Sequence, residues 1–192
     1  MHITGGKLRR REVNIVEQKK IRPTASKVRE AIFSMIGQDL HGISFLDSFG
    51  GSGIMGLEAW SRGADPVLIT EKDSRIAMQI RKQMEVFNAS IGVQCMDAIK
   101  GITGEWDVIF LDPPYRLSIH PFLEKSLLIA DWMVIAETAV ESPPDCTVLQ
   151  PTLNERRWTV WKQKKYGASM RTIFRRQALS SDWDDDQSES SA

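Results

Sequence analysis

A short proline-rich sequence, Asp112-Pro113-Pro114-Tyr115, is the sharpest candidate for chemistry in this chain. Two successive prolines donate no amide hydrogens and hold the residue before them in an extended conformation. With the Asp112 carboxylate beside them, the local carbonyls are expected to stay free as acceptors, which suits an amine donor. The Tyr115 ring offers a flat face to a planar group. The motif predicts a site for the exocyclic amine of a nucleobase, and the alternative is a loop that only ends a strand.

The chemistry expected there is methylation of that amine. An exocyclic amino group is a poor nucleophile because its lone pair is conjugated into the ring. Hydrogen bonds accepted from both of its N–H groups can hold the nitrogen in line with a methyl donor and favour the pyramidal nitrogen of the transition state. We therefore assign the catalytic role to Asp112, Pro113, Pro114 and Tyr115.

A glycine-rich stretch at residues 47–53 indicates a cofactor site. Its glycines let the backbone turn sharply and approach a ligand closely, and the helix expected after it presents free N–H groups. Gly51, Gly53 and Gly56 fit the G-x-G-x-x-G pattern of dinucleotide-binding loops. The stretch predicts a nucleotide-like cofactor, and a tight strand-to-helix turn is the alternative.

Two further acids stand where predicted strands end. Glu71 ends the second strand, where a carboxylate can accept hydrogen bonds from both ribose hydroxyls of an adenosine. Asp97 ends the third strand, where a carboxylate can accept from the adenine amino group. A solvated residue at a strand end explains either acid alone about as well, but acids at all three strand ends, Asp47 included, favour a cofactor site.

The elements that must position these residues alternate along the chain. Apolar residues at helical spacing predict helices over 24–42, 54–62, 73–87 and 119–129. Short apolar runs predict strands over 43–47, 67–71, 93–96, 107–112 and 132–137, and a closing antiparallel pair over 158–162 and 170–174. This order indicates an α/β fold with a doubly wound, mostly parallel, Rossmann-like sheet covered on both faces. Because the first and fourth strands of such a sheet are neighbours at the topological switch point, the glycine-rich stretch and Asp112 should lie side by side.

Charge is distributed unevenly, although the formal net charge is zero. Residues 1–30 carry nine Lys and Arg against three Asp and Glu, residues 31–154 carry eight against sixteen, and residues 155–176 carry eight against one. Two basic blocks flanking an acidic centre suggest a catalytic body whose ends meet a polyanion, whereas solvated surface charge is the plainer interpretation. We expect a basic arm at 1–23 that becomes ordered on a polyanion, one domain at 24–178, and an acidic, disordered tail at 179–192.

Other features exclude several classes of protein. No apolar run is long enough to cross a bilayer, and no secretory signal precedes the first basic residues. Cys95 and Cys146 match no metal spacing and, without a signal, point to a reducing cytoplasm. His2, His41 and His120 form no triad or metal cluster, so we interpret all three as incidental and expect no metal.

These motifs resemble those of the RsmD family, bacterial S-adenosylmethionine-dependent methyltransferases that act on N2 of a guanine in 16S rRNA. The matching segments are residues 2–7, 22–30, 46–58 and 109–115, with a basic strand after Lys165-Tyr166-Gly167. Residues 22–30 are the most discriminating, because general amino-methyltransferases lack this stretch. Arg10 departs from the family's usual glycine, and Glu137 fits the family pattern without a role that we can assign.

The resemblance implies a class I methyltransferase fold and a role for each matching residue. The cofactor, S-adenosylmethionine, would be bound by Asp47, Phe49, Gly51, Gly53, Glu71 and Asp97, and the guanine by residues 112–115. RNA phosphates would be bound by the late basic strands and by Lys7, Arg9, Arg10, Arg22, Thr24 and Arg29. The partner would be 16S rRNA within the small ribosomal subunit or an assembly intermediate.

The expected protein is a cytoplasmic, monomeric rRNA methyltransferase that touches no membrane. Three alternatives remain at this point. The same chemistry could act on another amine, such as DNA adenine or a protein glutamine. The glycine pattern alone would also suit a nicotinamide-dependent oxidoreductase, and an RNA-binding protein with a vestigial cofactor pocket is the third alternative.

Overall fold

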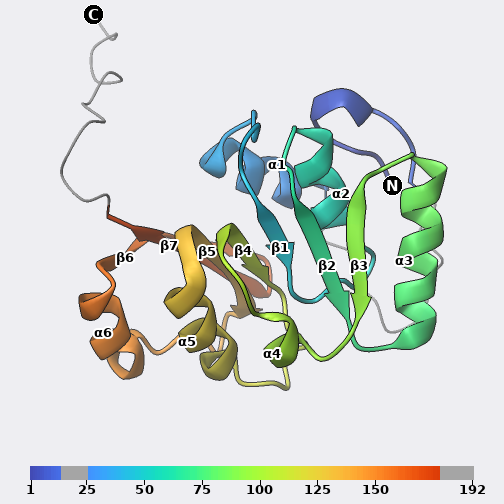
Figure 1. Ribbon diagram of the computed structural model, residues 1–192. Coiled ribbons are helices and arrows are strands. Elements are labelled where there is room, and N and C mark those ends of the chain that lie inside the picture. The colour runs from blue at the N-terminus through green and yellow to red at the C-terminus, as the bar shows by residue number, and fades with distance from the viewer. Residues whose placement is uncertain (14–25, 178–192) are drawn as a thin grey trace, which may run out of the picture.

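The computed structural model describes residues 1–13 and 26–177, and its strands form one seven-stranded sheet (Figure 1). The strands are β1 (Phe45–Asp47), β2 (Val67–Glu71), β3 (Ile91–Cys95), β4 (Trp106–Leu111), β5 (Ala130–Ala139), β6 (Trp158–Tyr166) and β7 (Ser169–Arg176). Their order is β3-β2-β1-β4-β5-β7-β6. Strands β1 to β5 pair in parallel, and β7 is antiparallel to both β5 and β6. The predicted doubly wound sheet with a closing antiparallel pair is confirmed.

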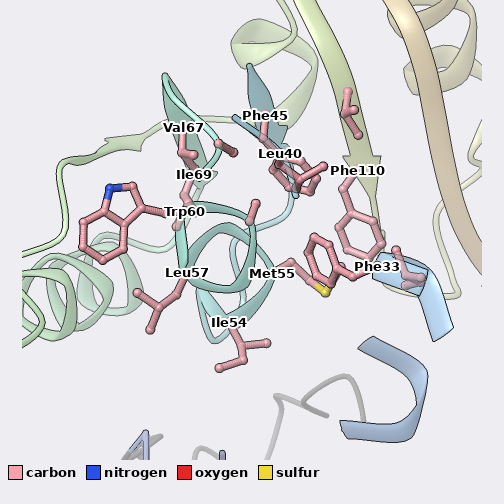
Figure 2. Close-up of a cluster of buried hydrophobic side chains, with 14 of the residues drawn as sticks. Phe33, Leu40, Phe45, Ile54, Met55, Leu57, Trp60, Val67, Ile69 and Phe110 are labelled. Carbon is pink, nitrogen blue, oxygen red and sulfur yellow. The ribbon is translucent and has the colours of Figure 1, made fainter. Parts of the chain in front are cut away.

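Helices cover both faces of the sheet. They are η1 (Gly6–Leu8), α1 (Ser26–Ile36), α2 (Ile54–Ser61), α3 (Ser74–Val86), α4 (Ala98–Gly101), α5 (His120–Ile129) and α6 (Cys146–Glu155). Buried residues of α1, α2 and α3 belong to one apolar cluster, and those of α5 and α6 belong to a second cluster on the other face. Figure 2 shows part of the first cluster, with Phe33 of α1, Leu57 of α2 and Phe110 of β4 around the sheet.

The predicted elements differ from the observed ones mainly at their ends. Strand β2 has the predicted bounds, and Asp73 caps α3 by accepting from the amides of Arg75 and Ile76. Helix α1 ends at Ile36, before the predicted end, because Gly37 takes φ 111°. Sequence analysis missed η1, α4 and α6. The first two are one turn long, and α6 contains a proline that is typical of loops.

The two edge strands depart from the expected burial on both faces. The prediction that each strand is covered on both sides fails for β3, all of whose residues are exposed or only partly buried, and for β6, in which only Trp158 is buried. The physical reason is their place at the edges of the sheet, where β3 pairs with β2 alone and β6 with β7 alone.

The first thirteen residues correct the expectation of an irregular arm. Ile3 and Val13 are fully buried in the first apolar cluster, and the backbone of the segment turns back on itself through a bridge between His2 and Glu12. Gly6 has φ 69°, and a Cβ there would lie 1.8 Å from the carbonyl oxygen of Ser61 on α2. The segment therefore packs on α2 as part of the folded domain. Within the described residues, no helix is long and apolar enough to cross a membrane.

Candidate active site

The strand register brings the glycine-rich loop and the proline motif together. Asp47, at the end of β1, lies opposite Phe110 of β4, two residues before Asp112. The loop after β1 and the loop after β4 therefore leave the same edge of the sheet from neighbouring strands. This is the switch point, because β2 continues the sheet on one side of β1 and β5 continues it beyond β4.

A row of charged side chains crosses this edge on one face of the sheet. Leu111 of β4 pairs with Ala136 of β5, so the next residues, Asp112 and Glu137, are neighbours. Glu137 in turn lies directly opposite Arg171 of β7. Successive side chains on a strand point to opposite faces. The row therefore shares its face with the first apolar cluster, because the residues two positions away on β4, β5 and β7 belong to that cluster, namely Phe110, Ile135 and Ile173.

Asp47 is the most buried acid of the predicted cofactor site. Burial, and to a smaller extent the nearby Glu71, raises the pKa of its carboxyl to about 7 against the lowering effect of the Phe49 and Gly56 backbone amides. Its Oδ1 atom is buried and has no hydrogen-bond partner. A buried acceptor without a donor is costly, so this atom is suited to receive a cationic or N–H group of a ligand.

Glu71 fixes the backbone of the glycine-rich loop through a hydrogen bond. The Glu71 Oε2 atom accepts from the Gly51 amide at 3.0 Å, and Oε1 accepts from the Asp73 amide at 2.9 Å. Gly53 is the N-cap of α2 with φ 70°, a left-handed conformation that favours glycine. The backbone thus turns directly from the end of β1 into the helix, as the sequence predicted.

Phe49, within this loop, and Asp97, after β3, are the remaining residues predicted to bind the cofactor. Phe49 packs edge-to-face on Phe122 of α5, with ring centroids 5.0 Å apart. Asp97 is exposed and caps α4 by accepting from the Ile99 amide at 3.0 Å. Each residue therefore has a structural role in the chain alone, and the assignment of both to a cofactor remains a prediction.

Asp112 carries a strongly perturbed carboxyl group at the end of β4. Burial is the main cause that raises its pKa to about 8, Glu137 and Asp47 raise it too, and Arg171 lowers it. The Tyr115 side chain is 46% exposed, and its hydroxyl lies 2.8 Å from the Ser169 hydroxyl of β7. The motif thus combines a carboxyl whose charge is sensitive to its surroundings with an accessible ring.

One detail of the proline motif corrects the sequence analysis. We expected the local carbonyls to remain free, but the Pro114 carbonyl accepts from the Leu117 amide at 2.8 Å. A tight turn follows the motif and uses this acceptor, so the Asp112 carboxylate is the stronger candidate for binding an amine.

The pairing of Glu137 with Arg171 was missed by sequence analysis. Glu137 Oε2 accepts from Nε of Arg171 at 3.2 Å and from Nη2 at 2.9 Å, and both residues are buried. Arg171 also lies over the Tyr166 ring, 4.5 Å from its centroid. The sequence signal was an acid in an otherwise apolar strand, but its partner could not be named without the register of β5 and β7.

A pocket of about 290 Å³ lies beside the proline motif. Its lining includes Pro113, Tyr115, Thr138 and Ser142. The buried Thr138 hydroxyl has no hydrogen-bond partner. One prediction is corrected here, since His120 is not incidental: it lines the pocket, and its Nε2 accepts from the Asp145 amide at 2.9 Å.

The predicted RNA-binding residues have different surroundings. Arg9 and Arg10 are exposed, and Lys7 extends over the Trp60 ring, 3.3 Å from its centroid. Arg10 has φ 68°, which explains why a glycine suits this position. Arg22 and Thr24 lie outside the described residues.

Arg29 is the clearest correction to the predicted RNA contacts. Its side chain is 0% exposed, and its Nε donates to Oε1 of Glu58 at 3.1 Å. Glu58, on α2, also accepts from the Thr4 amide at 2.7 Å and lies 3.4 Å from Nη2 of Arg62. Arg29 therefore joins α1 and the N-terminal segment to α2, and its guanidinium is withdrawn from any phosphate at the surface.

Within residues 1–13 and 26–177, no group of three or more His, Cys, Asp or Glu side chains is arranged to hold a metal ion. What the site offers is a buried unpaired carboxylate oxygen, a glycine loop opening a helix, and a second carboxyl with an exposed ring. These groups fit a cationic, nucleoside-like ligand beside a planar amine.

Residues 1–175 match the model of a family described as "Conserved hypothetical protein 95". The chain is 30% identical over 176 residues to "Ribosomal RNA small subunit methyltransferase D" of Haemophilus influenzae, covering 87% of this chain and 89% of that relative. The similarity to this named relative therefore extends over most of the chain.

Solved structures share the fold. A structure described as "Putative methyltransferase yhhF from Escherichia coli" has a TM-score of 0.75 and 25% identity, covering 93% of this chain and 99% of that one. The magnesium protoporphyrin IX methyltransferase of Synechocystis, 13% identical with a TM-score of 0.65, covers 79% of each chain and shares the fold alone.

Proposed function

The chain belongs to the family described as "Conserved hypothetical protein 95". On that premise we propose that it transfers a methyl group from S-adenosylmethionine to the exocyclic N2 amine of a guanine in 16S rRNA. The observation that carries the proposal is the register of β1 with β4, which sets the glycine-rich loop beside the motif at Asp112. We also place the protein in the cytoplasm, as a monomer that acts on the small ribosomal subunit or an assembly intermediate.

The residues at the edge of the sheet fit S-adenosylmethionine. The unpaired Oδ1 of Asp47 is suited to the ammonium group of the methionine part, because a buried carboxylate gains most from a cationic donor. Glu71 is suited to the ribose hydroxyls, and the glycine loop lets the backbone approach the ligand. Asp97 would accept a hydrogen bond from the adenine amino group, and Phe49 would contact the cofactor from within the glycine-rich loop.

The bound cofactor supplies an electrophilic methyl group on a positively charged sulfur. Asp112 accepts a hydrogen bond from the guanine amine and orients its nitrogen toward that methyl. Tyr115 packs on the base, and its hydroxyl is fixed by Ser169. The nitrogen would take up the methyl group as the carbon–sulfur bond breaks with its electron pair left on sulfur, and it would then release a proton to solvent.

The charge of Asp112 links the two ligands. In the chain alone its pKa of about 8 leaves the carboxyl largely protonated at neutral pH. A positive charge placed at the same edge favours the carboxylate, which is the form that accepts hydrogen bonds without donating one. Asp112 would thus become the stronger acceptor once the methyl donor is in place.

The rRNA substrate is proposed from the relatives' names, and one experiment separates it from other amines. Purified protein is incubated with S-adenosylmethionine carrying a labelled methyl group and with 16S rRNA, duplex DNA or total protein. We expect label in 16S rRNA alone, recovered after digestion as N2-methylguanosine. Label in DNA adenine or in a glutamine side chain would overturn the substrate, and tight binding of NAD without methyl transfer would overturn the reaction.

A further inference from the structure

Strands β6 and β7 form the edge of the sheet opposite β3 (Figure 1), and one face of this hairpin is rich in cations. Lys162 pairs with Ile173, and Lys164 pairs with Arg171. Paired residues of neighbouring strands share a face, and Ile173 belongs to the first apolar cluster. These lysines therefore project on the same side of the sheet as the charged row at Asp112.

Aromatic rings hold these cations in place. The Trp161 ring lies between two of them, with Lys162 Nζ at 4.1 Å and the Arg175 guanidinium at 5.5 Å from its centroid. Lys164 Nζ is 5.4 Å from the centroid of the Tyr166 ring. Contact with a ring restricts a long flexible side chain, so less entropy is lost when the cation binds an anion.

No acid among residues 1–13 and 26–177 neutralises the three exposed cations of this face. Within the described residues, Arg171 and Arg176 form ion pairs with acids, whereas Lys162, Lys164 and Arg175 form none. All three are exposed. Edge lysines also prevent unwanted strand pairing, but that role does not explain Arg175, which lies on the inner strand β7.

The cationic face is continuous with the catalytic motif. Ser169, which begins β7, touches the Tyr115 hydroxyl at 2.8 Å. Tyr166, which ends β6, lies opposite Ser169 and also contacts Arg171 of the charged row. A strand that delivers a nucleotide to Tyr115 can therefore continue across the hairpin without leaving this face.

We propose that this face of the β6–β7 hairpin binds the phosphates of the RNA strand that flanks the methylated nucleotide, through Lys162, Lys164 and Arg175. Phosphate contacts give affinity and position without reading sequence, whereas Asp112 and Tyr115 act on the base itself. The inference rests on the proposed function, because it takes RNA as the substrate.

The test compares two variants with equal loss of charge. In the first, Lys162, Lys164 and Arg175 are all changed to Gln. In the second, Arg81→Gln, Lys82→Gln and Lys100→Gln remove three exposed cations from α3 and α4. Affinity for a 16S rRNA transcript is measured against salt concentration, together with the affinity for S-adenosylmethionine and the methylation rate at saturating RNA.

For the hairpin variant we expect RNA affinity roughly 10- to 50-fold weaker near physiological salt, with a salt slope smaller by about 2, since each phosphate contact on a single strand contributes about 0.7. Cofactor affinity and the rate at saturating RNA should stay unchanged. The control variant should retain most of the wild-type affinity.

Equal effects of the two variants would overturn the proposal, because the loss would then reflect net charge alone. Tighter RNA binding by the hairpin variant would also overturn the proposal. That result would indicate that the cations of this face bind the chain's own acidic residues at 182–189 instead of RNA. A wild-type protein that binds RNA but methylates no guanine would refute the proposed function. The salt dependence of RNA affinity would still test whether this face of the hairpin binds phosphates.

Discussion

At the scale of single residues, the site is governed by how its carboxyl groups are charged. Asp112 and Asp47 both have raised pKa values because burial penalises the carboxylate. Arg171 is the base that lowers the pKa of Asp112, and Glu137 shares that base through two hydrogen bonds to one oxygen. The charge of the Asp112 carboxyl therefore depends on Glu137 and Arg171, to which we assign no contact with either proposed ligand.

The first prediction concerns Asp112 itself. Asp112→Ala should lower the methylation rate at saturating substrates by roughly 10²–10³-fold, because an acceptor placed at the reacting amine acts on the transition state. Affinity for S-adenosylmethionine should change by only a few fold, since Asp47 and the glycine loop remain. Single-turnover methyl transfer measures the methylation rate, and calorimetric titration measures the affinity for S-adenosylmethionine. Turnover of the variant at the wild-type rate would show that Asp112 only ends a strand.

A second prediction uses Glu137. Replacing its carboxylate in Glu137→Gln removes a negative charge that raises the pKa of Asp112, so this pKa should fall. The acid limb of the pH profile of kcat/KM should then move to lower pH, by up to about one unit. Circular dichroism checks that the variant folds. A limb that stays in place, or moves to higher pH, would contradict the assignment of that limb to Asp112.

At the scale of elements, helix α2 joins the N-terminal segment to the cofactor loop. Its first residue follows Gly53, and its buried Glu58 accepts from Thr4 and pairs with Arg29 and Arg62. The segment 1–13 is therefore part of the domain's core. This corrects the expectation of a basic arm that becomes ordered only on a polyanion.

The third prediction tests that connection. Glu58→Gln should lower the free energy of unfolding by about 3–5 kcal/mol, because it leaves two buried guanidinium groups without their shared carboxylate. Deletion of residues 1–12 should also lower the melting temperature, since it strips Ile3 from the core. Chemical denaturation gives the first quantity. Glu85→Gln, at an exposed position of α3, is the matched control and should change stability by less than about 0.5 kcal/mol.

At the scale of the whole molecule, the acids of the site gather at one edge of the sheet, and the hairpin carries three exposed cations that form no ion pair within the described residues, Lys162, Lys164 and Arg175. The parallel strands all end at the same edge, so their strand-end acids add to one negative electrostatic potential. Under the proposed function, this arrangement would attract a cationic cofactor to the edge and a polyanion to the neighbouring face. It also costs stability in the absence of ligands.

The fourth prediction is the pH dependence of that stability. The pKa values of Asp47 and Asp112 are about 7 and 8 in the folded chain, against about 3.9 for an aspartate in an unfolded chain. Below pH 4 both states are protonated. As pH rises from 4 to 8, the unfolded chain ionises first, so these groups progressively destabilise the fold.

The melting temperature of the ligand-free protein should therefore fall by several degrees between pH 5 and pH 8 relative to an Asp47→Asn/Asp112→Asn double variant. Thermal melts of both proteins at matched ionic strength measure this difference. Parallel curves for the two proteins would show that the carboxyl groups ionise normally in the fold.

The sequence by itself determined the doubly wound sheet, with its first and fourth strands as neighbours, and the two motifs at its edge. Apolar runs, helical spacing and the turn chemistry of glycine and proline are local signals, and the handedness of parallel connections leaves few ways to arrange them. Asp47, Glu71 and Asp112 could be placed at strand ends for that reason. Helix α6 was missed because its internal proline is a local signal for a loop.

Only the tertiary structure decided which charges are paired and which are free. Arg29 and Arg175 are indistinguishable as letters in basic stretches, yet Arg29 is buried against Glu58 and Arg175 is exposed beside Trp161. Glu137 acquired a role only when the register set it opposite Arg171. Such pairings join residues far apart in the chain, so they depend on how the elements pack and leave no periodic trace in the sequence.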